Sequence, residues 1–191
     1  MIKVIDNVLS EESYNSLYKL LSNRIQGPYG YFPWYLSSNI AYSDKKDEYV
    51  DPNNFGFAHF FTSISKSPNE NAVIISQYGY PLLSILHNAC AQVGVNLLNL
   101  YQGRAFMLTP SISPGKASGI HTDLDFPHQV CLYYFNDSDG DTVFFDNDGK
   151  EMYRNTPKKN TAIMFDGNIP HTNETPTNFR YIVNFNYTFI K

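Results

Sequence analysis

The sequence predicts an α+β fold, in which N-terminal helices flank a jelly-roll core. Phe, Tyr and Trp make up 16% of the 191 residues, and aromatic side chains favour strands. Both amphipathic helical patterns lie in the first half of the chain. After Gly94, short β-type runs follow one another with turns but no helix between them, as in a sandwich or jelly roll. We expect a single domain, with helical and loop-rich support over 1–95 and the core over 96–191.

The first expected helix begins after Ser10, whose hydroxyl can cap the first turn, and Glu11 and Glu12 favour the positive end of the helix dipole. Its apolar face repeats at helical spacing: Tyr14, Leu17, Tyr18 and Leu21. The second expected helix covers about 81–93 and stops at Gly94. Between the helices, residues 27–72 are expected to form loops and short strands around a cleft.

The second half of the chain is expected to form seven strands. Turn residues at 137–140 and 147–149 separate some of them. The expected strands cover 97–102, 104–109, 119–125, 129–136, 142–145, 161–165 and 180–190. Alternation along 129–136 and 180–190 places Val130, Leu132 and Tyr134 on one face of their strand, and likewise Arg180 and Ile182 on theirs.

Composition argues against several classes of partner. Lys and Arg total 14 against 18 Asp and Glu, a net charge of −4, so we expect no basic surface for nucleic acid or an anionic membrane. No apolar run approaches the roughly 20 residues of a membrane span, and Asp6 interrupts any apolar signal segment. Cys90 and Cys131 lie in apolar contexts and are expected to be buried free thiols, which favours the cytoplasm.

Four residues together suggest a metal site with an arginine that can bind a carboxylate. His121 and Asp123 are two positions apart, so their side chains would share one face of a strand. His171 follows an apolar strand, and Arg180 opens the last strand. Two histidines and one carboxylate form the facial ligand set of non-haem Fe(II) oxygenases. Such a site leaves three open positions for a bidentate 2-oxo acid and O2, and an arginine can clamp the distal carboxylate of 2-oxoglutarate.

Residues 104–189 resemble the Fe(II)/2-oxoglutarate-dependent dioxygenases, and especially their prolyl hydroxylase branch in its small viral and bacterial style. The family pattern is His-x-Asp, a distant His, and Arg or Lys shortly after it, matched here by His121, Asp123, His171 and Arg180. The resemblance implies a double-stranded β-helix, Fe(II) held by the first three residues, and 2-oxoglutarate and O2 as co-substrates, with ascorbate a candidate reductant. In oxygen-sensing prolyl hydroxylases, a strand similar to 130–136 carries a Tyr that binds the C5 carboxylate of 2-oxoglutarate, a role that falls to Tyr134.

The resemblance also implies a substrate. The leading candidate is a prolyl residue in a protein or peptide, hydroxylated at a C–H bond; the alternatives are another side chain, a free amino acid or a small metabolite. Trp34 and Tyr35 are candidates for the wall of the substrate cleft. Two positions depart from the branch: 108–112 lacks a Tyr, and Asn186 stands where a Trp is common.

Two other classes stay open from the residues alone. One is a non-catalytic jelly-roll module that binds metal, and the other is a zinc hydrolase with Asp125 or His128 as its base. The bacterial and viral likeness places the protein in the cytoplasm of a bacterium or of a virus-infected host cell. The oligomeric state is left open.

Overall fold

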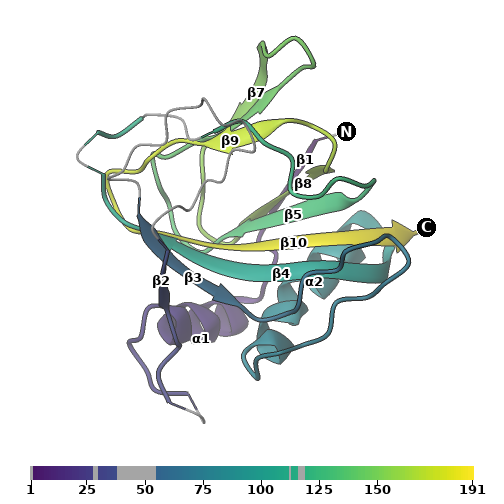
Figure 1. Ribbon diagram of the computed structural model, residues 1–191. Helices are drawn as coiled ribbons and strands as arrows, with labels where there is room; N and C mark the ends of the chain where they lie inside the picture. Colours follow the sequence, from purple (N-terminus) through teal and green to yellow (C-terminus); the bar gives the residue numbers. More distant parts are fainter. Residues whose placement is uncertain (1, 28–29, 38–54, 112, 116–118) are drawn as a thin grey trace.

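The computed structural model describes residues 2–27, 30–37, 55–111, 113–115 and 119–191, whose strands form two facing sheets (Figure 1). The large sheet has the strand order β1-β8-β5-β10-β4-β3-β2, and the small sheet has the order β7-β6-β9; every pairing is antiparallel. The strands are β1 (Lys3–Asp6), β2 (Tyr35–Ser37), β3 (Gly56–Phe60), β4 (Asn96–Leu108), β5 (Gln129–Tyr134), β6 (Thr142–Phe145), β7 (Glu151–Asn155), β8 (Thr161–Asp166), β9 (His171–Asn173) and β10 (Arg180–Ile190).

The two helices, α1 (Glu11–Leu21) and α2 (Gly79–Val93), cover the face of the large sheet that points away from the small sheet (Figure 1). The Oγ of Ser10 accepts a hydrogen bond from the backbone N–H of Ser13, so the predicted N-cap is confirmed. Gly94 ends α2 with φ +74°, a left-handed conformation that glycine adopts without strain. No helix in the described ranges is both long and apolar enough to cross a membrane.

Alternation along the central strands divides the interior into two clusters. On β5, Val130, Leu132 and Tyr134 point between the sheets, where they meet Phe144 of β6. Cys131 points to the opposite, helix-covered side. The predicted α+β class and double-stranded β-helix architecture are therefore confirmed, and both cysteines are buried and free, as expected.

The structure differs from the sequence prediction in its strands. The expected strands 97–102 and 104–109 form one strand, β4, which continues through Gly103. Three strands from the first 95 residues extend the large sheet, because β1 pairs with β8 while β3 pairs with β4 and β2. The expected strand 119–125 is wrong: its only pairing is an isolated bridge between His121 and His171, and bends follow. The short strands β7 and β9 were not predicted.

Candidate metal centre

The structure brings His121, Asp123 and His171 together at the edge of the small sheet. His171 begins β9, and its backbone N–H and C=O bond to those of His121, at 3.0 Å in each direction. The potential ligand atoms of the three residues all lie within 4.8 Å of one another. The two-residue spacing therefore lets the side chains converge even though 119–125 is not a strand.

Backbone carbonyls orient both imidazole rings. The Nδ1 of His121 lies 3.0 Å from the carbonyl oxygen of Gly119, and the Nδ1 of His171 lies 3.1 Å from that of Ile169. Because a carbonyl can only accept, each Nδ1 carries the proton and each Nε2 keeps a lone pair for a metal. Burial lowers the pKa of His171 to about 4, although Asp123 opposes part of this shift. The His171 ring is therefore neutral near pH 7, as a metal ligand must be.

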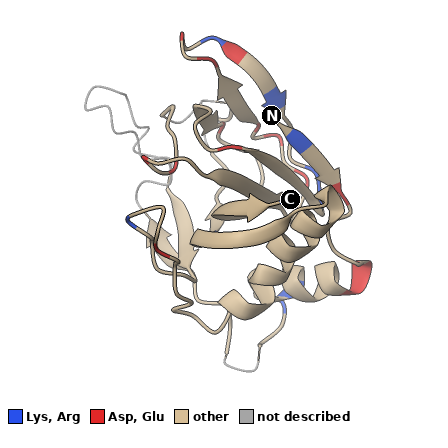
Figure 2. Cartoon of the chain, turned by 90° about the vertical axis from the view of Figure 1, so that its right-hand side faces the viewer, with Lys and Arg blue, Asp and Glu red and all other residues tan. Residues whose placement is uncertain are grey.

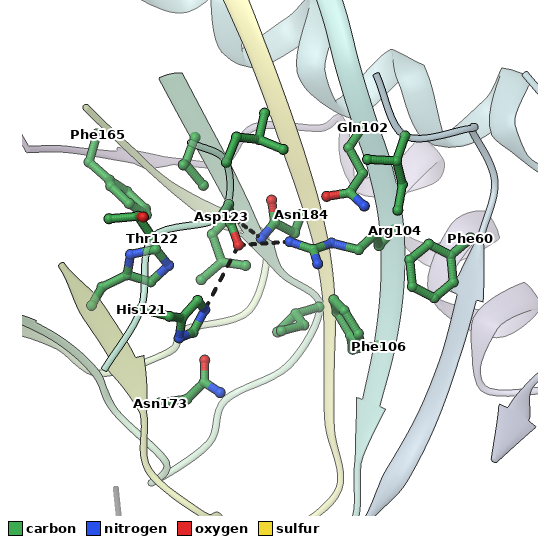
Figure 3. A pocket seen from close by; sticks show the side chains of 16 residues that line it. Phe60, Gln102, Arg104, Phe106, His121, Thr122, Asp123, Phe165, Asn173 and Asn184 are labelled. Carbon is green, nitrogen blue, oxygen red and sulfur yellow. Dashed lines mark hydrogen bonds and ion pairs between the residues drawn. The ribbon is translucent and has the colours of Figure 1, made fainter. Parts of the chain in front are cut away.

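Both oxygens of Asp123 are fixed by hydrogen bonds (Figure 3). Oδ1 accepts from Nη2 of Arg104 at 2.7 Å, and Oδ2 accepts from the amides of Asn184 at 3.1 Å and Asn186 at 2.8 Å. The side chain of Asp123 is only 3% exposed. Burial acts to raise the pKa of this carboxyl, but the charge of Arg104 and the two histidines hold the pKa far below its usual range. Asp123 is therefore an ionised ligand in a fixed position.

The sequence prediction missed these three partners of Asp123. Asn184 and Asn186 lie on β10, and Arg104 is paired with Asn184 across β4 and β10. The amino-acid sequence contained only a weak indication of these partners: two asparagines share the inward face of a largely apolar strand with Arg180 and Ile182. Asn186, noted as a departure from the prolyl hydroxylase pattern, thus has a defined contact with the candidate metal ligand.

The structure also brings Tyr134 and Arg180 together, at a deeper level between the sheets. Both side chains are fully buried. Arg180 donates from Nη1 to the carbonyl of Gly140 at 2.7 Å and from Nη2 to Oγ1 of Thr142 at 2.9 Å. The hydroxyls of Tyr134 and Thr142 are hydrogen-bonded at 2.9 Å. The Nε of Arg180 is buried without an acceptor among the described residues. Neither Arg180 nor Tyr134 lines the cavity beside the histidines.

That cavity has a volume of about 390 Å³ and contains all three candidate ligands in its wall. Its lining also includes Arg104 and apolar side chains from the large sheet and from the segment after β3, while the small sheet contributes His171 and Asn173 (Figure 3). Trp34 and Tyr35 are not among the lining residues. Trp34 donates from its indole N–H to the carbonyl of Leu21 at 2.8 Å and packs on the helix-side core. Tyr35 lies on β2 and is 64% exposed, so the structure gives neither residue a contact with the site.

Comparison with known proteins identifies the fold. No family model and no curated protein matches the sequence. Among solved structures, a 2OG-Fe(II) oxygenase family oxidoreductase from Burkholderia pseudomallei gives a TM-score of 0.70 at 11% identity, over 98% of this chain and 84% of that one. A prolyl hydroxylase from Trichoplax adhaerens, in complex with a peptide fragment of the hypoxia inducible factor oxygen degradation domain, gives 0.59 at 16% identity, over 97% and 82%.

A third structure extends the likeness to a viral enzyme. The viral collagen prolyl hydroxylase from Paramecium bursaria Chlorella virus-1, in complex with 2OG, gives a TM-score of 0.54 at 13% identity, over 100% of this chain and 96% of that one. The fold implied by the His-x-Asp, His and Arg pattern is thus found over nearly the whole length of the chain. The resemblance predicted from the sequence is confirmed at the level of architecture: the chain has the fold of the 2OG-Fe(II) oxygenases.

Proposed function

We propose that this protein is an Fe(II)- and 2-oxoglutarate-dependent oxygenase that hydroxylates a C–H bond. One observation carries the proposal: His121, Asp123 and His171 converge in the wall of a cavity, with both Nε2 atoms available and the carboxylate ionised. Two imidazoles and one carboxylate on one side of a metal are the donor set of mononuclear Fe(II) oxygenases. The fold is the one in which such enzymes occur.

The residues present fit the metal. His121 and His171 would hold Fe(II) through Nε2, and Asp123 through one carboxylate oxygen. Bound Fe(II), with 2-oxoglutarate and O2, supplies the oxidising chemistry that yields succinate, CO2 and a hydroxylated product. The carbonyls of Gly119 and Ile169 keep the rings oriented, and the three donors to Asp123 keep its carboxylate from turning away. Phe165, Val130 and other apolar lining residues exclude water from the deep part of the cavity.

Arg180 and Tyr134 are proposed to bind the C5 carboxylate of 2-oxoglutarate. A fully buried guanidinium is costly unless it meets an anion. Arg180 donates hydrogen bonds to two neutral groups, the Gly140 carbonyl and the Thr142 hydroxyl. The carboxylates of Asp141 and Glu174 act on it through their charge. Its Nε is a buried donor with no acceptor in the described part of the chain. A carboxylate is a stronger acceptor than either neutral group, which supports this assignment.

The alternative of a zinc hydrolase lacks a general base. Asp123 is the only carboxylate among the described lining residues, and its oxygens already accept three hydrogen bonds. Asp125 does not line the cavity. Nδ1 of His128 lies 2.8 Å from the carbonyl of Phe126, and the ring packs against Gly167. A module that only binds metal would have no use for the arginine and tyrosine that are fully buried deeper between the sheets.

For the substrate, we propose a residue in a protein or peptide, with proline as the leading candidate. The sequence pattern of the prolyl hydroxylase branch supports this choice. The Trichoplax prolyl hydroxylase of similar fold is in complex with a peptide. A free amino acid or a small metabolite is the alternative substrate.

The test is an anaerobic titration of the purified protein with Fe(II) and then 2-oxoglutarate. A weak visible charge-transfer band should appear only when both are present, and admitting O2 should release succinate. Protein loaded with Zn(II) is the control and should give neither signal. If Fe(II) and 2-oxoglutarate give no band and no succinate forms with any peptide or amino acid, the oxygenase proposal is wrong. If succinate forms but no proline gains oxygen by mass spectrometry, only the prolyl substrate fails.

A further inference from the structure

The guanidinium of Arg104 has one engaged end and one free end. Nη2 donates to Asp123 at 2.7 Å, while Nη1 has no hydrogen-bond acceptor within the ranges that the structure describes. The side chain is 18% exposed and lines the cavity. In Figure 3, one terminal nitrogen of Arg104 is directed at Asp123 and the other into the open space next to it. Arg104 therefore presents a charged donor to whatever enters the cavity.

Arg104 lies in the outer part of the cavity. Phe60 is its direct partner across β3 and β4 and is 42% exposed, and Ile64, in the same lining, is 51% exposed. By contrast, the lining residues Val130 and Phe165 on the central strands are 0% and 1% exposed. The ring of Phe106 lies 5.4 Å from the guanidinium carbon of Arg104. A ligand reaching Arg104 would thus have aromatic and aliphatic walls on the side that opens to solvent.

Arg104 shares its anionic partner with the candidate metal site. The described lining holds one cation, Arg104, and one anion, Asp123, which are paired. A metal held by Asp123 would draw on the charge of the same carboxylate. Arg104 would then keep only part of its anionic partner, while its Nη1 is still available to a second anion.

We propose that Arg104, through Nη1, binds a carboxylate of the substrate that is oxidised. The proposal rests on the proposed function and narrows it to acidic substrates: a carboxylic acid such as an amino acid, or a peptide with an acidic group close to the target residue. A charge-assisted hydrogen bond to a carboxylate is about twice as strong as a neutral one. A neutral prolyl peptide would leave Nη1 without a partner. Arg104 is then a specificity-determining residue as well as the holder of Asp123.

The experiment compares acids with their neutral amides in protein loaded with Zn(II) and saturated with 2-oxoglutarate, so that no turnover occurs. Three pairs are used: benzoate and benzamide; N-acetyl-L-proline and its amide; and a proline-containing pentapeptide with glutamate after the proline, against the same peptide with glutamine. Dissociation constants are measured by calorimetry or ligand-observed NMR. In at least one pair, the wild type should bind the acid about tenfold or more tightly than its neutral partner.

Arg104→Gln should bring that ratio close to one, and Arg104→Lys should keep part of it. The matched control is Arg154→Gln, which removes the same charge from β7. That strand projects at the top of the molecule and carries charges of both signs (Figure 2), and Arg154 does not line the cavity. This control should keep the wild-type ratio.

Three outcomes would overturn the proposal. The first is a wild type that prefers no acid to its amide, which needs no variant to detect. The second is an acid preference that survives in Arg104→Gln. The third is a preference that appears only without 2-oxoglutarate, because Arg104 would then belong to the co-substrate site. Failure of the proposed function is separately visible as a lack of 2-oxoglutarate binding to the metal-loaded wild type, and the same pairs can then be measured on the metal-free protein. The pair that shows the preference indicates whether the acid is a free molecule or part of a peptide.

Discussion

The guanidinium carbon of Arg180 lies 5.4 Å from the ring centroid of Tyr134, and both side chains hydrogen-bond to the hydroxyl of Thr142. Burial lowers the pKa of Arg180, while the neighbouring Tyr134 opposes the shift. Tyr134 therefore stabilises the charged form of Arg180 at a position that is buried from water. Such an arrangement favours an anionic ligand, because a carboxylate would replace neutral acceptors with a charged one.

Arg180→Ala is expected to weaken 2-oxoglutarate binding by at least about a hundredfold, because removing one partner of a desolvated charge pair costs several kcal/mol. Tyr134→Phe should act in the same direction but less strongly, since one neutral hydrogen bond is lost. The measurement is the 2-oxoglutarate dependence of succinate formation, together with calorimetric Fe(II) affinity, which should change little. Arg24→Ala is the control, because Arg24 lies 5.6 Å over the ring of Tyr18 in a similar pair on α1's side of the sheet. Unchanged 2-oxoglutarate affinity in Arg180→Ala would place the clamp elsewhere.

His121→Ala and His171→Ala are each expected to abolish Fe(II)-dependent turnover of 2-oxoglutarate, because two protein ligands do not hold the facial geometry. Both variants should stay folded, since neither ring is a member of the two hydrophobic clusters. His171→Ala should be the less stable of the two, because its ring packs against Phe165 and Phe144. Succinate release and circular dichroism measure the two effects. The exposed His87→Ala on α2 is the control and should retain activity. Normal turnover in either ligand variant would refute the metal assignment.

Asn186→Ala is expected to lower metal affinity by about 10- to 100-fold, the usual effect of removing a residue that orients a metal ligand. Its amide donates to Oδ2 of Asp123 at 2.8 Å from a fully buried position. Asn184 also donates to Oδ2, so Asp123 should keep its place in part. Calorimetric titration with Mn(II) measures the affinity, and the exposed Asn88→Ala on α2 is the control. Equal Mn(II) affinity in Asn186→Ala and wild type would show that Arg104 and Asn184 are enough to hold Asp123 in position.

His121 and Asp123 could be predicted from the sequence because their spacing is local information, whereas the distant His171 was assigned through the family pattern. His-x-Asp places two donors together whether the segment is a strand or, as here, an isolated bridge. The same holds for the alternation on β5 and β10, which follows from strand geometry alone. Alternation alone does not say that β5 and β10 are neighbours, so the position of Tyr134 near Arg180 was expected only from the resemblance to the prolyl hydroxylase branch.

The partners of Asp123 could not be predicted, because they depend on which strands are neighbours. Arg104 meets Asp123 only since β4 and β10 are paired and place it opposite Asn184. The same is true of β1 in the N-terminal half, because it pairs with β8, more than 150 residues later in the chain. Single-residue pairings such as that of His121 leave no periodic pattern in the sequence, which is why 119–125 was assigned wrongly.

Cys90 and Cys131 are expected to resist thiol reagents in the folded protein. Burial raises the pKa of Cys90 to about 11, and it also raises the pKa of Cys131. Because only the thiolate reacts, both thiols should be unreactive at pH 8. A colourimetric disulfide reagent should label neither cysteine in native buffer and both in 6 M guanidinium chloride. Rapid labelling of the native protein would contradict the burial of these thiols.

Gly103→Ala is expected to destabilise the protein by about 1–3 kcal/mol, the usual cost of overpacking a core. A Cβ at this position in β4 would overlap the ring of Phe61, with Cζ only 2.6 Å away. That ring cannot move aside easily, because it is fully buried and packs edge-on against Phe185 at 5.7 Å between centroids. Urea unfolding followed by tryptophan fluorescence gives the free energy of unfolding. The double variant Phe61→Leu/Gly103→Ala tests the cause: if the two side chains collide, it should be more stable than the sum of the single changes predicts. Additive effects would mean that Gly103 is required for another reason.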